Sequence, residues 1–250
     1  MSLENKKVLV TGGARGIGFE TAQLFLDRGA DVAVWALHEE SIQAAKEQFS
    51  QPVFGQAVDV GDIESVQTAA KQLREEFGSI DVLVNNAGYT LTTRFLTEDR
   101  SYWERVVATN LWGVIYTMRE FLDDMIASEK GSIVNVVSDA GRVGMSGEAV
   151  YAASKGGVVA FSKSMAQEVA RYGVRVNCVS PGPTRTGILE SNSEDEQAKK
   201  LIDKMIRKIP LRQIAEPKEV AEAIVFFGGD GASHVTGQVL SVSGGLTMSD

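Results

Sequence analysis

A tyrosine and a lysine stand four positions apart in the segment Tyr151-Ala-Ala-Ser-Lys155. On a helix this spacing places both side chains on one face, within mutual reach. An unperturbed tyrosine titrates near pH ~10, but a neighbouring ammonium favours the phenolate and lowers the pKa of the hydroxyl. The pair is therefore suited to take a proton from an alcohol or to give one to a ketone.

Two further polar residues could serve the same chemistry. Ser138 follows the apolar run Ile133 to Val137, and its hydroxyl could hydrogen-bond a substrate oxygen as charge develops there. Asn110 lies inside a long helical pattern, where asparagine has poor propensity, and a role in holding water would explain it. Each feature also has a structural interpretation, because Tyr-x-x-x-Lys pairs are common, strand-end serines are often caps and Asn110 could mark a bend.

A glycine-rich segment, Thr11-Gly-Gly-Ala-Arg-Gly-Ile-Gly18, follows the first apolar run and opens a helical pattern. Glycines let the backbone turn tightly and approach a pyrophosphate at a helix N-terminus, and Gly18 would allow the helix to pack closely on the strand. The spacing G-x-x-x-G-x-G differs from the G-x-G-x-x-G dinucleotide fingerprint, and no Lys-Ser/Thr pair follows, which excludes a P-loop. A methyltransferase loop and a turn without a ligand remain open.

The second apolar run ends in Ala36-Leu37-His38, where an acid would normally hold the ribose of NAD. No acid stands there. We interpret His38 as a solvated residue at a helix start, and Glu39 and Glu40 as first-turn acids that the helix dipole favours.

The fold that positions these residues is predicted by short β-branched runs that alternate with helical patterns. The runs are almost wholly apolar, as expected for strands covered by helices on both faces. They predict an α/β fold, a three-layer doubly wound Rossmann-type structure with a seven-stranded parallel sheet. The predicted strands are Val8 to Thr11, Val32 to Trp35, Val53 to Val58, Val82 to Asn85, Ile133 to Val137, Val174 to Val179 and Val239 to Val242.

The intervals between strands predict six helices, and no stretch resembles a linker, so residues 1–250 should form a single catalytic domain. Residues 138–150 and 183–210, after the fifth and sixth strands, do not follow the alternation of strand and helix patterns. Both follow strand ends where ligands bind in such sheets, so we expect them to wall a substrate pocket. The predicted helices are Ile17 to Arg28, Glu39 to Phe49, Ile63 to Phe77, Tyr102 to Ser128, Tyr151 to Tyr172 and Pro217 to Gly228.

Composition excludes several other classes. The formal charge is −8 and no basic run could follow a string of phosphates, so nucleic-acid binding is not expected. No segment approaches about 18 consecutive apolar residues, and the polar first residues lack the apolar run of a signal peptide, so we expect a cytoplasmic protein without a membrane span. Cys178 is the single cysteine, and the histidines His38 and His234 are far apart, so neither a disulfide nor a metal site is predicted.

Taken together and in order, these motifs resemble the short-chain dehydrogenase/reductase family across essentially the whole chain. The resemblance is carried by Thr11-Gly12-x-x-x-Gly16-x-Gly18, Asp59, Asn85-Asn86-Ala87-Gly88, Asn110, Ser138, Tyr151-x-x-x-Lys155 and Pro181-Gly182. It implies a catalytic tetrad of Asn110, Ser138, Tyr151 and Lys155. It also implies a homotetramer or homodimer packed through the helices that carry Asn110 and Tyr151.

The same resemblance implies how a dinucleotide would lie. Asp59 and Val60 would contact the adenine, Lys155 would also hold the nicotinamide ribose, and Thr184 and Thr186 would meet the carboxamide. Taken alone, Asn85 to Gly88 could be only a turn. The full set of implied cofactor residues is Gly12, Arg15, Gly16, Ile17, Gly18, Ala36, Leu37, Asp59, Val60, Asn86, Ala87, Gly88, Tyr151, Lys155, Pro181, Gly182, Thr184 and Thr186.

Two positions bear on the choice between the two cofactors. Family members that prefer NAD usually carry an acid where Ala36 stands, and many NADP users carry a basic residue at the position of Arg15. Leu37 stands where a second basic residue is frequent. We therefore expect NADP(H) to be favoured, with NAD(H) possible because nothing in the sequence forbids it.

Within the family the chain resembles 3-oxoacyl thioester reductases acting on acyl carrier protein or CoA thioesters, so the implied activity is NAD(P)(H)-dependent interconversion of a ketone and a secondary alcohol. Residues 137–184 together with Gly237 to Met248 also resemble dehydrogenases of alicyclic 2-hydroxyacyl-CoA thioesters, here 2-hydroxycyclohexanecarboxyl-CoA. Arg142 could meet an anionic acyl carrier, although surface arginines are common. A non-catalytic cofactor-binding regulator is disfavoured by the complete tetrad, and a nucleotide-sugar epimerase or dehydratase by the short region after residue 183.

Overall fold

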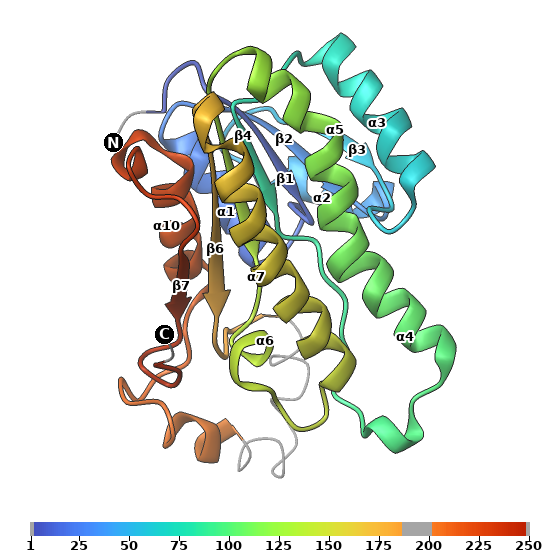
Figure 1. Ribbon diagram of the computed structural model, residues 1–250, viewed down its shortest axis with the longest axis vertical. Coiled ribbons are helices and arrows are strands. Elements are labelled where there is room, and N and C mark those ends of the chain that lie inside the picture. Colours follow the sequence, from blue (N-terminus) through green and yellow to red (C-terminus); the bar gives the residue numbers. More distant parts are fainter. Residues whose placement is uncertain (1–2, 187–201, 249–250) are drawn as a thin grey trace.

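Seven parallel strands form one sheet in the order β3-β2-β1-β4-β5-β6-β7 (Figure 1). The computed structural model describes residues 3–186 and 202–248. Each predicted strand is confirmed to within two residues, and so is the Rossmann-type fold. The strands are β1 Lys7–Thr11, β2 Asp31–Ala36, β3 Phe54–Ala57, β4 Val82–Asn85, β5 Gly131–Val136, β6 Val174–Pro181 and β7 Val239–Val242.

The strand order reverses beside β1, which pairs with β2 on one side and with β4 on the other. Chain connections leave this point in opposite directions, so a crevice opens beyond the carboxyl ends of β1 and β4. The glycine-rich segment follows β1, and the segment beginning at Asn86 follows β4. The topology therefore places two of the predicted cofactor segments at the switch point.

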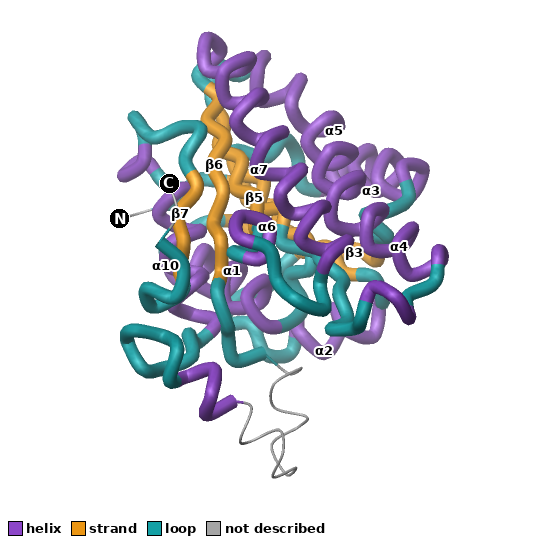
Figure 2. Tube along the Cα trace, turned by 60° about the horizontal axis from the view of Figure 1, so that its bottom comes forward, coloured by secondary structure: helices purple, strands orange, loops and turns teal. Residues whose placement is uncertain are grey.

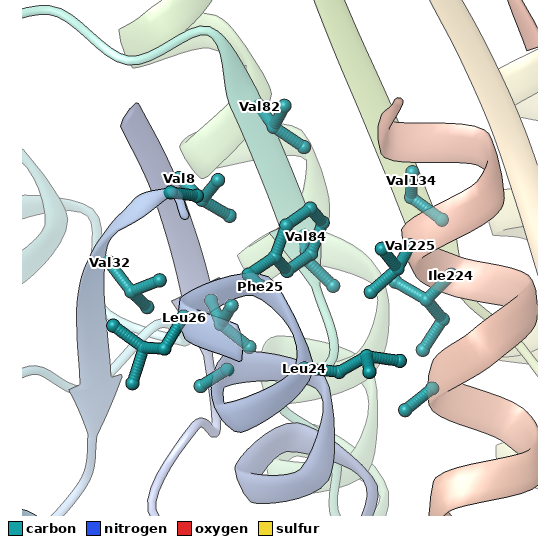
Figure 3. Close-up of a cluster of buried hydrophobic side chains, with 14 of the residues drawn as sticks. Val8, Leu24, Phe25, Leu26, Val32, Val82, Val84, Val134, Ile224 and Val225 are labelled. Carbon is teal, nitrogen blue, oxygen red and sulfur yellow. The ribbon is translucent and has the colours of Figure 1, made fainter. Parts of the chain in front are cut away.

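Helices cover both faces of the sheet, and each face has its own apolar core. On one face α1 and α10 pack against each other and bury Phe25 and Ile224 on valines of the central strands (Figure 3). Helices α3, α5 and α7 lie on the other face (Figure 2). The core of that face contains Leu83, Phe121 and Ile133. Strands covered on both faces explain why the strand sequences are apolar without alternation. The helices are α1 Gly16–Asp27, α2 Glu39–Lys46, α3 Ile63–Glu76, α4 Arg100–Val107, α5 Gly113–Ala127, α6 Ala140–Val143, α7 Ala149–Val169 and α10 Pro217–Gly228.

The prediction of one continuous helix from Tyr102 to Ser128 was wrong. A π-helical turn, Ala108–Trp112, separates α4 from α5, and Asn110 lies in its middle. A π turn inserts an extra residue into the helical ladder, which hydrophobic periodicity does not reveal.

The two segments expected to wall a substrate pocket differ in how far the structure describes them. Residues 138–150 contain the short helix α6, and Thr93 N donates to Gly147 O (3.0 Å), which ties this segment to the loop after β4. Of residues 183–210, positions 187–201 lie outside the described residues. No helix among the described residues is long and apolar enough to cross a membrane.

Candidate active site

Tyr151 lies in the first turn of α7, and Ser138 lies just beyond the end of β5. The Ser138 hydroxyl is close enough to the Tyr151 hydroxyl to act against the rise of its pKa, and the Ser138 hydroxyl oxygen accepts from the backbone N of Ala140 (3.2 Å). The carboxyl end of β5 and the start of α7 therefore bring together two residues that are far apart in the sequence. A substrate oxygen placed between the two hydroxyls could receive a proton from one while being held by the other.

Lys155 lies one turn after Tyr151 and is 3% exposed. Its Nζ donates to Val136 O (2.8 Å) and lies 5.8 Å from the centre of the Tyr151 ring. The helical spacing thus places both side chains on one face, as predicted. Burial lowers the pKa of Lys155 to about 8. Lys155 therefore loses its positive charge at a lower pH than an exposed lysine does.

The pKa of Tyr151 moves in the direction opposite to the one expected from the sequence. Burial of the phenol, and then the carboxylate of Glu148, raise the pKa of Tyr151 to about 12, and only the hydrogen bond with Ser138 acts against them. Lys155 is not among the groups that shift this pKa, and its Nζ is held by Val136 O. The expectation that the ammonium and an oxidised nicotinamide together favour the phenolate stays a prediction. Tyr151 is therefore a protonated acid at neutral pH.

Asn110 is fully buried in the π turn and connects α4 to the loop after β4. Its Nδ2 donates to Val106 O (2.9 Å) and Tyr89 O (2.6 Å), and its Oδ1 accepts from Tyr89 N (3.3 Å). A Cβ added to Gly88 would lie 3.1 Å from Asn110 Oδ1 and 3.8 Å from Lys155 Nζ. Asn110 and Lys155 therefore border the same small space beside Gly88. The water-holding role predicted for Asn110 stays a prediction.

The glycine-rich turn is braced by Asn86. Its Nδ2 donates to Thr11 O (3.0 Å) and Gly12 O (3.2 Å), while Thr11 Oγ1 accepts from the backbone N of Asn86 (3.0 Å) and of Ala87 (3.1 Å). A Cβ on Gly18 would lie 2.1 Å from Gly12 O. Gly18 is thus required by the turn itself, and not only by packing of the helix on the strand as the sequence suggested.

Other predicted cofactor residues border the same turn. Gly16 has φ +55°, and a Cβ built on it would first meet Thr186 at 3.5 Å, so Thr186 from the segment after β6 lies over the start of α1. Arg15 is exposed at the N-cap of α1, and Ile17 follows in its first turn. Gly182 N donates to Val242 O (3.0 Å), and Thr184 Oγ1 donates to Gly182 O (3.0 Å), which fixes the backbone after Pro181.

The residues expected to meet the adenosine lie at the ends of β2 and β3. Leu37 is exposed, and Ala36 is partly buried with its carbonyl accepting from Val58 N (2.8 Å). Asp59 is exposed, and its Oδ1 accepts from Gly61 N (2.8 Å). Val60 is buried in the core, so that only its backbone could face an adenine.

The arrangement fits a dinucleotide on the grounds of its own geometry. Gly12 has φ +64° and a Cβ there would lie 2.9 Å from Ala87 Cα, so the fold itself excludes a side chain; Gly16 has φ +55° and leaves the backbone bare at the start of α1. The N-terminus of α1 points into the same crevice and favours an anion. Gly12, Gly16, Ala87 and Thr186 would hold such a group at the switch point.

Sequence reasoning missed a buried polar network beneath the site. Asp139 is 6% exposed and accepts from Ser180 Oγ (2.7 Å) and Ser241 Oγ (2.7 Å), which joins the ends of β6 and β7 to the segment after β5. Asn85 Nδ2 donates to Asn135 Oδ1 (2.9 Å), and Asn135 Nδ2 donates to Ser162 Oγ (2.8 Å). Polar residues inside apolar strands were the available signal. Glu148 was also missed as a neighbour of Tyr151.

Comparison with known proteins agrees with this geometry. A sequence model of the family described as Enoyl-(Acyl carrier protein) reductase matches residues 12–247. 3-Oxoacyl-[acyl-carrier-protein] reductases from Chlamydia trachomatis and Vibrio harveyi are 37% and 38% identical over 98% and 99% of this chain and 98% and 100% of their own length. The enzyme from Escherichia coli K12 is 35% identical over 99% of this chain and 100% of its own.

Among solved structures, levodione reductase superimposes with a TM-score of 0.91 and 29% identity, and the match covers 97% of both chains. The matches extend along nearly the full length of the chain, in both sequence and structure. The chain belongs to the short-chain dehydrogenase/reductase family of oxidoreductases.

Proposed function

We propose that this oxidoreductase reduces the ketone of a 3-oxoacyl thioester, carried by acyl carrier protein or CoA, to the secondary alcohol, with NADP(H) favoured and NAD(H) possible. The observation that carries the proposal is the pair formed by Tyr151 and Ser138. The Tyr151 hydroxyl keeps its proton at neutral pH and lies near enough to the Ser138 hydroxyl for Ser138 to affect its pKa, at the carboxyl end of the sheet. When a ketone is reduced, one such group can protonate the ketone oxygen while the second hydroxyl stabilises the negative charge that develops there.

In this mechanism the reduced nicotinamide, when bound, supplies the hydride to the ketone carbon. Ser138 orients the ketone oxygen and donates to it as negative charge develops. Tyr151 gives its hydroxyl proton to the same oxygen and completes the alcohol. Lys155 would hold the nicotinamide ribose, and Asn110 would keep the Tyr89 loop and a water molecule in place beside Lys155. Oxidation of the alcohol runs these steps in reverse.

Arg15 and Ala36 support the choice of NADP(H). The Arg15 guanidinium is exposed at the N-cap of α1 and can pair with a 2′-phosphate, whereas Ala36 has no carboxylate to hold a free ribose hydroxyl. A cytoplasmic location and a homotetramer or homodimer belong to the same proposal, and no nucleic-acid partner is expected at a charge of −8.

A second candidate is a dehydrogenase of an alicyclic hydroxyacyl-CoA or another small alcohol. It is favoured by the structural likeness to levodione reductase, whose name describes a ketone substrate that is not an acyl carrier thioester. The same Tyr151 and Ser138 pair would serve either substrate, so the substrate must be decided by turnover.

The test is binding of NADPH and NADH separately, followed by turnover of each with an acetoacetyl thioester and a 2-oxocyclohexanecarboxyl thioester. We expect NADPH to be preferred and the acetoacetyl thioester to be the better substrate. Arg15→Ala should reduce the preference for NADPH by about tenfold. Arg171→Ala, which removes an exposed arginine in the 3₁₀ turn after α7, should leave this preference unchanged. Preference for NADH with the cyclic thioester would instead establish the second candidate.

A further inference from the structure

Asp139 directly follows Ser138 in the turn after β5, and the proposed mechanism gives it no role. It is 6% exposed, yet its carboxylate is held by hydroxyl groups from two other strands. Ser180 Oγ donates to Asp139 Oδ1 (2.7 Å), and Ser241 Oγ donates to both Oδ1 (2.7 Å) and Oδ2 (2.7 Å). The carboxylate therefore fastens the turn to the carboxyl ends of β6 and β7.

The backbone of this turn, residues 138–141, is fixed in the same place. Asp139 N donates to Pro181 O (3.2 Å), so main chain and side chain of Asp139 both bind the end of β6. Inside the turn, Ser138 Oγ accepts from Ala140 N (3.2 Å) and Ser138 O accepts from Gly141 N (2.9 Å). Because these short-range bonds make the turn one unit, a shift of Asp139 moves the Ser138 hydroxyl with it.

The opposite side of the turn packs against α7, the helix that carries Tyr151. A Cβ built on Gly141 would lie 2.7 Å from Gly156 N and 2.8 Å from the carbonyl carbon of Lys155. Backbone thus meets backbone at this contact. The turn is held between α7 on one side and the ends of β6 and β7 on the other, so loss of the carboxylate would let Ser138 move relative to Tyr151.

We propose that Asp139 is a positioning residue for the reduction, whose carboxylate anchors the turn to β6 and β7 and so keeps the Ser138 hydroxyl at the ketone oxygen. The inference rests on the proposed role of Ser138. Burial strengthens the hydrogen bonds of the carboxylate and makes their loss costly. Because Pro181 directly precedes Gly182, the same anchor fixes Ser138 relative to the segment that would meet the nicotinamide.

The experiment is a double-mutant cycle on kcat. Wild type, Asp139→Ala, Ser138→Ala and the combined variant are compared with the preferred nicotinamide and whichever of the two thioesters wild type reduces faster. If Asp139 acts by placing the Ser138 hydroxyl, its removal has little effect once that hydroxyl is absent, whereas a general loss of structure lowers kcat in both backgrounds. Single-turnover rates with enzyme in excess follow the slow variants.

Two further variants serve as controls. Asp139→Asn keeps the Oδ1 to which both serines donate, so we expect it to retain most of the wild-type kcat. Asp230→Ala removes a carboxylate at the opposite edge of the sheet, where it pairs with Lys6 (3.5 Å), and should leave kcat unchanged.

We expect Asp139→Ala to lower kcat about tenfold in the wild-type background and less than about twofold in the Ser138→Ala background. Equal losses in both backgrounds, an unchanged kcat, or an Asp139→Asn protein as impaired as Asp139→Ala overturn the inference alone. If Asp139→Ala does not fold, Ser241→Ala takes its place in the cycle, with an expected loss of about threefold that again disappears in the Ser138→Ala background. A wild-type protein that reduces neither thioester with either cofactor overturns the proposed function, and the inference with it.

Discussion

At the scale of single residues, the site holds Tyr151 as an acid, and its phenolate, the base that alcohol oxidation needs, forms only at higher pH. Tyr151 has a pKa of about 12 and Lys155 one of about 8, so near neutral pH the phenol is protonated and the amine is mostly charged. Both states suit reduction. In the oxidative direction the phenolate is required, and kcat/KM for the alcohol should rise with pH across the neutral and alkaline range.

Tyr151→Phe tests the assigned proton donor. The change removes one hydroxyl and leaves the ring, so we expect turnover to fall by about a thousandfold or more while NADPH binding stays near that of wild type. Steady-state rates and fluorescence titration with the cofactor measure the two effects. Tyr172→Phe, in the 3₁₀ turn that follows this helix, should retain full activity. Substantial turnover by Tyr151→Phe would contradict the role assigned to the hydroxyl.

Lys155 carries a stability cost that depends on pH in a defined direction. Its pKa falls from 10.5 in the unfolded chain to about 8 in the folded protein, so the unfolded state binds more protons between these values and stability rises with pH through this window. Replacement by Met removes the buried charge. We expect Lys155→Met to raise the free energy of unfolding at pH 7 by about 1–2 kcal/mol, after the lost hydrogen bond to Val136 O is subtracted.

Urea denaturation at several pH values tests this prediction. The advantage of Lys155→Met over wild type should shrink as the pH approaches about 10, where the wild-type amine is neutral in both states. Lys163→Met, an exposed lysine on the same helix, should show no such trend. A Lys155→Met protein less stable than wild type at pH 7 would mean that the ammonium stabilises the fold.

At the scale of elements, the turn between β1 and α1 is held together by a contact that only glycine allows. A methyl group on Gly18 would lie 2.1 Å from Gly12 O and 2.5 Å from Asn86 Nδ2. Gly18→Ala must therefore displace the turn or detach Asn86 from it. We expect a loss of about 1–3 kcal/mol in stability and a loss of about a hundredfold in NADPH affinity.

Calorimetry of cofactor binding and thermal unfolding measure these two losses. Gly157→Ala is the matched control, because its methyl group would meet only the Leu111 side chain at 3.4 Å or more, within a helix that favours alanine. If Gly18→Ala bound NADPH with wild-type affinity, the turn would not be part of the cofactor site.

The elements also show which parts of the structure sequence patterns can reveal. Buried strands such as β4 and the capped helix α10 were predicted to the residue, because apolar runs and Pro217 mark them directly. The π turn at Asn110 was not predicted, since it alters the backbone ladder and leaves the apolar spacing nearly intact. The direction of the Tyr151 pKa was also missed, because it depends on burial and on Glu148, which only the folded chain brings into range.

At the scale of the whole molecule, one sheet gathers the site from segments spread across the chain. The ends of β1, β4, β5 and β6 are followed by the glycine-rich turn, Asn86, Ser138 and Thr184, respectively. All four therefore lie at one edge of the sheet. The two cores on either face hold these ends in place. Parallel topology thus explains why the motifs could be recognised in order along the sequence although they meet only in three dimensions.

The outer surface of the α5 and α7 layer carries a large exposed aromatic side chain beside the π turn. Trp112 is 46% exposed at the π turn and is stacked on Tyr116, with ring centres 5.7 Å apart. Large exposed aromatic side chains commonly anchor interfaces. We therefore expect light scattering at micromolar concentration to give a mass of at least twice 26.9 kDa for wild type, and a lower mass for Trp112→Lys. Leu96→Lys, at a residue that is 94% exposed in the loop after β4, should leave the mass unchanged. A monomeric wild-type protein would contradict the prediction, whereas an assembly unaffected by Trp112→Lys would place the interface on another face.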